Sequence, residues 1–161
     1  MITYNIYTDG GCRNNGKENA LGAWSFVILD DNYYLIDAKA NAIIKNPTNI
    51  RAEMLAIIHA FHYLCMKHNF NELDCININF YTDSQFICDC INLKWIDNWQ
   101  KHNWKKRNKE SVLNQDLWKI LLSYLHMFPN NTFNFVKGHN NNKYNELCDQ
   151  LVNNVMNLWR R

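Results

Sequence analysis

Four acidic residues have the side-chain types and surroundings to act together. Asp9 and Asp83 each close a Tyr-Thr-Asp tripeptide after an alternating apolar segment, while Glu53 and Asp149 lie near the start of helical patterns. Carboxylates that gather repel one another and raise each other's pKa unless a cation neutralises them. Oxygen ligands without fixed Cys or His partners suit Mg²⁺ or Mn²⁺ better than zinc. For each acid alone a turn cap or a solvated charge is the simpler role, but the four together indicate a divalent-cation site.

Alternating apolar residues predict the strands that would carry two of these acids. The pattern marks five segments, at residues 1–8, 21–29, 33–41, 74–81 and 132–136. Gly10 and Gly11 are expected to end the first strand directly after Asp9, in a tight turn with positive φ. If the first and fourth strands are parallel neighbours, Asp9 and Asp83 lie side by side at one edge of the sheet.

Apolar residues at helical spacing predict the remaining elements. They mark helices at about residues 49–67, 84–92, 94–104, 114–128 and 143–160. The order of three strands, helix, strand, helices, strand and helix predicts an α/β fold. We expect a five-stranded mixed sheet, with its first three strands antiparallel, covered by helices on both faces.

Composition is that of one ordinary globular domain spanning residues 1–161, with 47% hydrophobic and 20% charged residues. We see neither an apolar run of membrane-spanning length nor a signal-peptide pattern, so we expect a cytoplasmic protein without a membrane partner. Without a secretory signal the six cysteines are expected to be reduced. Because no zinc-ligand spacing is present, we expect them to be structural thiols.

One segment is strongly basic although the chain carries a net charge of only +2. Residues 94–109 hold six Lys or Arg side chains against the single acid Asp97, which indicates contact with a polyanion. Three tryptophans are interleaved with these cations. We expect Trp95 and Trp99 to pack against the body, and leave packing or base stacking open for Trp104.

Five motifs occur in an order that resembles type 1 ribonuclease H of the bacterial kind, a single catalytic domain with a basic handle, and they cover essentially the whole chain. They are Tyr7-Thr8-Asp9-Gly10-Gly11-Cys12, Arg51-Ala52-Glu53, Tyr81-Thr82-Asp83-Ser84-Gln85, Val136-Lys137-Gly138-His139 and Asn145-Glu146-Leu147-Cys148-Asp149. The resemblance implies a ribonuclease H-like fold and hydrolysis of the RNA strand of an RNA–DNA hybrid. Two Mg²⁺ ions per site, replaceable by Mn²⁺, would support attack by water, leaving 5′-phosphate and 3′-hydroxyl ends. We expect a monomer.

The resemblance also assigns roles to individual residues. The metal-binding acids are Asp9, Glu53, Asp83 and Asp149. His139 matches the family's mobile histidine, which suits proton transfer or product release. Polar contacts to the hybrid's minor groove fall on Cys12, Asn15, Asn49 and Gln85. The handle, at about residues 94–110, supplies the remaining substrate contacts, Lys101, Trp104, Lys105, Lys106 and Arg107.

Three alternatives remain beside this hypothesis. They are a catalytically silent hybrid-binding protein, a ribonuclease H domain detached from a reverse transcriptase, and a junction resolvase of the same superfamily. The handle and the full motif order argue against the resolvase. The four acids argue against a silent binder, because clustered negative charge facing phosphate does not help binding.

Overall fold

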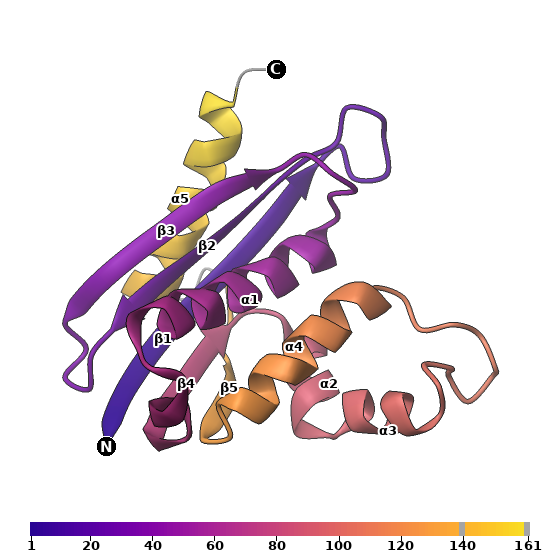
Figure 1. Cartoon of the computed structure of the whole chain (residues 1–161). Coiled ribbons are helices and arrows are strands. Elements are labelled where there is room, and N and C mark those ends of the chain that lie inside the picture. The colour runs from indigo at the N-terminus through magenta and orange to yellow at the C-terminus, as the bar shows by residue number, and fades with distance from the viewer. Residues whose placement is uncertain (139–140, 160–161) are drawn as a thin grey trace.

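A five-stranded mixed sheet lies between two layers of helices in the computed structural model, which describes residues 1–138 and 141–159 (Figure 1). The strands lie in the order β3-β2-β1-β4-β5. The pairs β1–β2 and β2–β3 are antiparallel, as the sequence predicts, and β1–β4 and β4–β5 are parallel, so the sheet is mixed as expected. The strand bounds are β1 Ile2–Arg13, β2 Leu21–Leu29, β3 Leu35–Ile43, β4 Ile76–Thr82 and β5 Asn131–Phe135.

Two helices cover opposite faces of the sheet, and the others lie beside them (Figure 1). Helix α1 packs on β1 and β2 with α4 at its side, and α5 packs on the other face of β1 and β2. The bounds are α1 Asn49–Lys67, α2 Gln85–Asn92, α3 Trp95–Lys101, α4 Gln115–Met127 and α5 Lys143–Leu158, with a 3₁₀ helix at Phe70–Cys75. Within the described ranges, no helix is long and apolar enough to cross a membrane.

Side-chain oxygens cap the N-termini of the helices that carry Glu53 and Asp149 and of the helix that follows Asp83. The Thr48 side chain accepts a hydrogen bond from the backbone N–H of Arg51 at 3.1 Å, which caps α1. Ser84 caps α2 in the same way, and Asn142 caps α5. A cap of this kind contributes about 1 kcal/mol by satisfying a donor that has no partner within the helix.

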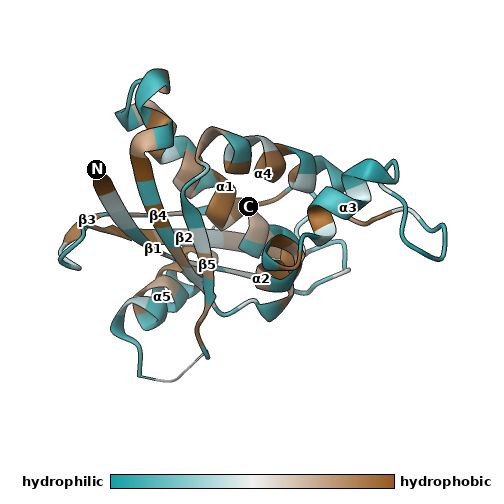
Figure 2. Cartoon of the chain, turned by 90° about the horizontal axis from the view of Figure 1, so that it is seen from below, coloured by the Kyte–Doolittle hydropathy of each residue, from teal (hydrophilic) through white to brown (hydrophobic). Residues whose placement is uncertain are grey.

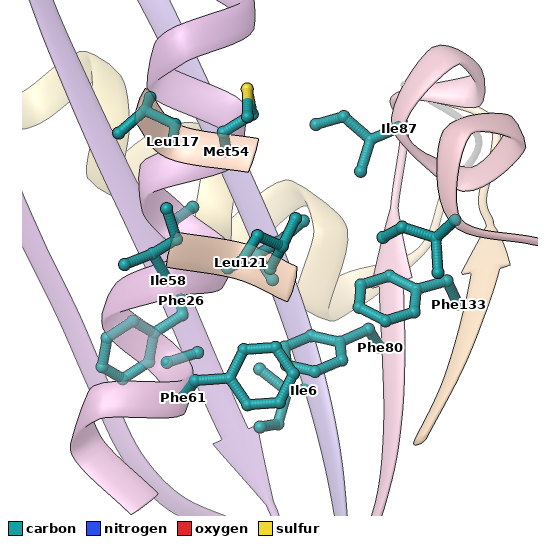
Figure 3. Packing of buried hydrophobic residues seen from close by; sticks show 14 of the residues in the cluster. Ile6, Phe26, Met54, Ile58, Phe61, Phe80, Ile87, Leu117, Leu121 and Phe133 are labelled. Atoms are coloured by element: carbon teal, nitrogen blue, oxygen red, sulfur yellow. The ribbon is translucent and has the colours of Figure 1, made fainter. Parts of the chain in front are cut away.

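The larger hydrophobic core lies between the sheet and the layer formed by α1 and α4. Figure 3 shows Phe61 of α1 directed toward Phe80 of β4, and their ring centroids are 4.9 Å apart. Phe80 also stacks on Phe133 of β5 at 4.8 Å. Each fully buried phenylalanine stabilises the fold by roughly 1.5–3 kcal/mol. This packing fixes α1 relative to β1 and β4, the three elements that bear or precede Asp9, Glu53 and Asp83.

The structure corrects the expected turn at Gly10 and Gly11. Strand β1 continues to Arg13, which pairs with Leu21, and positive φ angles occur later, at Asn14 (55°) and Gly16 (81°). Gly10 is needed for a different reason: a Cβ there would lie 2.3 Å from the carbonyl carbon of Ala52. Glycine inside a strand therefore serves a close approach of helix α1 here, and not a turn.

The handle consists of α3 and the loop that projects beyond it at the edge of the molecule, and this loop is largely hydrophilic (Figures 1 and 2). Helix α3 ends at Lys101, earlier than predicted, because Asn103 and Trp104 adopt left-handed φ angles of 54° and 58°. Trp99 is half-buried, and Trp95 is 39% exposed with its ring centroid 6.5 Å from that of Phe86 in α2. All six cysteines lie in described residues and are free thiols, as expected.

Candidate active site

Asp9 and Asp83 occupy equivalent positions on neighbouring parallel strands, Asp9 within β1 and Asp83 directly after the end of β4. Tyr7 of β1 is in register with Tyr81 of β4, and each is followed by Thr and then Asp. The two tyrosine rings stack with centroids 4.7 Å apart and planes 14° apart. The identical tripeptides thus bring the two acids to matching positions across the β1–β4 pair, where the charge of Asp83 adds to the rise that burial causes in the pKa of Asp9.

Glu53 reaches the same place from helix α1. The backbone of α1 rests directly on Gly10, where a Cβ would lie 2.4 Å from the Glu53 nitrogen. The Ser84 side chain, just after Asp83, makes a hydrogen bond with the Glu53 carboxylate. Burial, with a smaller contribution from Asp83, raises the pKa of Glu53 to about 7 despite that hydrogen bond. The start of α2 therefore orients Glu53, and the negative charge of Asp83 acts on the Glu53 carboxylate.

Asp149 is brought in by helix α5 from the opposite face of the sheet. Its neighbour Cys148 is fully buried, and the Cys148 carbonyl accepts a hydrogen bond from the Ser25 hydroxyl at 2.8 Å. The Cys148 thiol donates to the carbonyl of Tyr7 at 3.3 Å. These two bonds fix α5 to β2 and β1, and the Asp149 charge contributes to the raised pKa of Asp9.

Asp9 is the electrostatic centre of the four acids. It is 7% exposed, and burial is the main reason that its pKa rises to about 8. The charges of Asp83, Asp149 and Glu53 raise the pKa further, whereas a hydrogen bond from the Gly10 backbone lowers it. Near neutral pH, Asp9 therefore holds a proton unless a cation replaces it.

The donor set fits a hard divalent cation. All four side chains offer carboxylate oxygens, which are the preferred ligands of Mg²⁺. Outside the gaps at 139–140 and 160–161, no three His, Cys, Asp or Glu side chains come together closely enough to be a ready-made metal site. The acids thus interact through their charges, which act over longer distances than metal–ligand bonds.

The chain that leaves β5 passes next to Asp83. The Val136 N–H donates to the Thr82 carbonyl at 2.9 Å, and a Cβ on Gly138 would lie 3.2 Å from Asp83 Oδ2. The backbone of Gly138 therefore borders the acids. His139 follows it in sequence but lies outside the described residues, so its role stays a prediction.

Two of the residues expected to contact the minor groove are joined to each other. The Cys12 N–H donates to Asn49 Oδ1 at 2.8 Å, which links β1 to the start of α1. Gln85 is exposed next to Asp83 and Ser84, and its amide donates to Asp89 Oδ1 at 2.8 Å. Asn15 is exposed in the connection between β1 and β2. Cys12 lies on β1, Asn49 on α1 and Gln85 on α2, the elements that bear or follow the acids, and Asn15 lies on the adjoining turn.

The handle cations lie apart from this cluster, around a cavity of about 810 Å³ that Trp95, Trp99, Lys105, Lys106 and Arg107 help to line. Lys101 is exposed nearby. The Trp104 ring is only 8% exposed, with the Lys119 ammonium 5.5 Å from its centroid. Because that ring is buried, the structure favours packing over base stacking for Trp104.

Sequence reasoning missed three supporting residues. Ser84 contacts Glu53, and its position before a helix was the available signal, since Ser is a preferred cap. Gly10 permits the approach of α1. Arg51 forms two hydrogen bonds with the Asp116 carboxylate, at 2.9 and 2.7 Å, which ties α1 to α4. Nothing in the local pattern predicts that last pair, because the two residues are far apart in sequence.

The fold and the four acids upon it define a ribonuclease H-like protein. Among solved structures, the fold is similar to that of LC9-RNase H1, with a TM-score of 0.79 and 20% identity over 96% of this chain and 72% of the other. It is also similar to LC11-RNase H1 solved with an RNA/DNA hybrid, with a TM-score of 0.68 and 22% identity over 96% of each chain.

Sequence comparisons identify the family. The RNase H family model matches residues 2–157. The ribonuclease H of Clostridium botulinum is 38% identical over 151 residues, which are 94% of this chain and 93% of that protein. The chain belongs to the ribonuclease H family, a family of nucleases.

Proposed function

We propose that the protein is a metal-dependent endoribonuclease that hydrolyses the RNA strand of RNA–DNA hybrids. The observation that carries the proposal is the convergence of Asp9, Glu53, Asp83 and Asp149 in one electrostatic cluster: burial raises the pKa of Asp9 to about 8, and the charges of the other three acids add to that rise. A cluster of carboxylates that must be neutralised suits a site for divalent cations that act on a phosphodiester. Membership of the ribonuclease H family supports the choice of substrate.

The four carboxylates would hold two Mg²⁺ ions, for which Mn²⁺ can substitute. Bound there, such ions activate water and stabilise negative charge on the phosphate and on the leaving oxygen. We propose in-line attack of water on phosphorus with departure of the 3′ oxygen, so that products carry 5′-phosphate and 3′-hydroxyl ends. Within the chain, Ser84 orients Glu53, the Gly10 N–H orients Asp9, and His139 transfers a proton or assists product release.

Substrate selection would combine groove contacts and phosphate contacts. Cys12, Asn15, Asn49 and Gln85 lie on or beside the elements that bear the acids, where small polar groups can meet 2′-hydroxyls and base edges. The exposed handle cations Lys101, Lys105, Lys106 and Arg107 would contact phosphates of the DNA strand. LC11-RNase H1, which shares the fold, has been solved with an RNA/DNA hybrid, which supports this class of ligand.

Two alternatives make different predictions. A catalytically silent binder would hold the hybrid without cutting it under any metal. A domain detached from a reverse transcriptase would share the chemistry, and the foamy viral protease-reverse transcriptase does share the fold, at a TM-score of 0.78 with 15% identity. The basic handle and the 38% identity to a bacterial ribonuclease H favour the bacterial type.

The selectivity of cleavage tests the proposal. Matched RNA–DNA, RNA–RNA and DNA–DNA duplexes, labelled on each strand in turn, are incubated with the protein and Mg²⁺. We expect cuts only in the RNA strand of the hybrid, at several internal positions, and products that a 5′-phosphate-dependent exonuclease degrades. Cutting of the DNA duplex, or products with 2′,3′-cyclic phosphate ends, would overturn the proposal. Tight hybrid binding without cutting would instead establish the silent binder.

A further inference from the structure

Four tyrosines form a cluster on the face of the sheet covered by α5, and we call them the tyrosine cluster: Tyr7, Tyr33, Tyr81 and Tyr144. Tyr7 stacks on Tyr81, and its centroid is 5.6 Å from that of Tyr144. The hydroxyls of Tyr33 and Tyr81 are 3.0 Å apart, within hydrogen-bond distance. These residues come from β1, β4, the turn between β2 and β3, and α5. The cluster therefore connects four segments that are distant in sequence.

Two hydrogen bonds of the cluster hold the first turn of α5. The Tyr144 hydroxyl donates to the backbone carbonyl of Tyr33 at 3.0 Å. Asn142, the residue that caps α5, donates to the Tyr7 hydroxyl at 3.4 Å while its Oδ1 accepts from the N–H groups of Tyr144 and Asn145, each at 3.1 Å. The start of α5 is thus attached both to β1 and to the turn between β2 and β3.

The turn that receives the Tyr144 hydroxyl is itself well defined. Tyr33 has a left-handed φ of 63°, and its N–H donates to the Asp30 carbonyl at 3.0 Å. The Asp30 carboxylate accepts from the N–H groups of Asn32 at 2.8 Å and Tyr34 at 3.0 Å. A turn with this many internal bonds presents the Tyr33 carbonyl in a fixed place, so it is a firm anchor.

Helix α5 carries Asp149 in its second turn, so the placement of the start of this helix decides where that carboxylate lies. Helix ends are the parts that open most readily, and opening would move the start of α5 away from β1. The Cys148 bonds oppose this movement from the side of the sheet. The tyrosine cluster opposes it from the end of the helix.

We propose that Tyr33 and Tyr144 are positioning residues: the bond between the Tyr144 hydroxyl and the Tyr33 carbonyl, together with the Tyr33–Tyr81 contact, tethers the first turn of α5 and holds Asp149 close to Asp9. The consequence for catalysis rests on the proposed function. The tether itself does not, because it is a property of the folded chain.

The variant Tyr144→Phe removes the hydroxyl and keeps the ring. Loss of one hydrogen bond should speed amide exchange in residues 145–151 by about two- to tenfold, with exchange in α1 unchanged. In hybrid cleavage we expect kcat to fall by a similar factor of about two to ten, with KM unchanged and a higher Mg²⁺ concentration for half-maximal rate. Tyr34→Phe is the matched control, since Tyr34 adjoins Tyr33 but its side chain is 71% exposed.

A second variant, Tyr33→Phe, removes the contact to Tyr81 and should produce the same pattern. If both variants leave exchange in α5 unchanged, the tether is refuted. If exchange in α5 rises while kcat and the Mg²⁺ dependence stay at wild-type values, the tyrosines are structural only and the positioning role is refuted. If the wild-type protein does not cut the hybrid, the proposed function fails, whereas the exchange experiment still decides whether the tether exists.

Discussion

A Cβ atom on Gly10 would lie 2.4 Å from the backbone nitrogen of Glu53, closer than non-bonded atoms approach. Strand β1 and helix α1 are therefore in backbone contact at the point where each carries an acid, Asp9 and Glu53. Because Asp9 follows the strand register and Glu53 follows the helix, this one contact sets the spacing between the two carboxylates. The site thus depends on a residue that has no side chain.

Gly10→Ala should be strongly destabilising. The added methyl would collide with the backbone of Ala52 and Glu53, which cannot move as a flexible side chain can. We expect a loss of about 3 kcal/mol or more in the free energy of unfolding, at the upper end of overpacking effects. Urea-induced unfolding measures it.

Gly11→Ala is the matched control for that experiment. Its Cβ would meet Val152 Cγ1 at 3.4 Å and Met156 Cε at 3.8 Å, which are side-chain contacts of ordinary length. We expect a change within about 1 kcal/mol, as for surface-like substitutions without a clash. Equal effects at the two positions would show that Gly10 is not a special point of approach.

Stability should depend on pH through Asp9. Its pKa is about 8 in the folded protein against 3.8 as the ordinary value, so between these pH values the folded state binds the extra proton. Stability from this group is then highest at low pH and is lost as pH rises toward 8. Asp9→Asn removes this titration, so the free energy of unfolding of the variant should exceed that of the wild type by an amount that grows with pH. Because one pKa unit corresponds to about 1.4 kcal/mol, we expect the difference to reach about 2 kcal/mol or more.

Thermal unfolding at about pH 5 and about pH 8.5, without divalent cations, measures that difference. Asp31→Asn serves as the control, because Asp31 is exposed in a turn. A constant gap between wild type and Asp9→Asn across this range would contradict a buried, proton-holding Asp9. Added Mg²⁺ should narrow the gap at high pH by neutralising the carboxylates.

Much of this architecture was predictable from local patterns, and the exceptions have physical reasons. Alternation along Ile2, Tyr4 and Ile6 predicted strand β1, and the structure meets the condition, parallel pairing of β1 with β4, under which the matching Tyr-Thr-Asp tripeptides bring Asp9 and Asp83 together. Gly10 was interpreted through its conformational freedom, whereas its role is to leave room for a distant helix. A close approach between two elements depends on the tertiary structure, and the sequence of one strand does not reveal it.

The handle was likewise predictable only in part from the sequence. Its charge was evident from composition, but the burial of its tryptophans was not. The left-handed residues Asn103 and Trp104 follow the end of α3, and Trp104 is buried whereas Trp95 is exposed. Helical spacing alone assigned both rings to a longer helix. The tyrosine cluster was equally hidden, since its members come from four separate segments.

Neutralising handle cations should weaken substrate binding in a salt-dependent way. We expect Lys106→Gln combined with Arg107→Gln to raise KM for the hybrid and leave kcat nearly unchanged. The slope of log KM against log salt should flatten by up to about 2, one unit for each lost phosphate contact. The control is Lys39→Gln combined with Lys67→Gln, which removes the same charge from β3 and the end of α1. An identical slope in both double variants would contradict contact between the handle and the substrate.

His139→Ala should slow turnover without weakening binding. Proton transfer by a positioned histidine contributes about 10²- to 10⁴-fold, and a role in product release lowers kcat alone as well. We expect kcat to fall by at least about tenfold, with KM little changed. His126→Ala, in the last turn of α4, provides the comparison. Steady-state kinetics on a labelled hybrid decide the matter, and a kcat equal to that of wild type would exclude this role for His139.

The most direct test of the four-carboxylate site compares wild type with Asp9→Asn on one hybrid labelled in its RNA strand. Each protein is incubated with Mg²⁺, with Mn²⁺ or with a chelator, and hybrid binding is measured in parallel. We predict cleavage by wild type only when a divalent cation is present, and none by Asp9→Asn, although that variant stays folded and binds the hybrid. Cleavage by wild type in chelator, or undiminished cleavage by Asp9→Asn, would contradict the account.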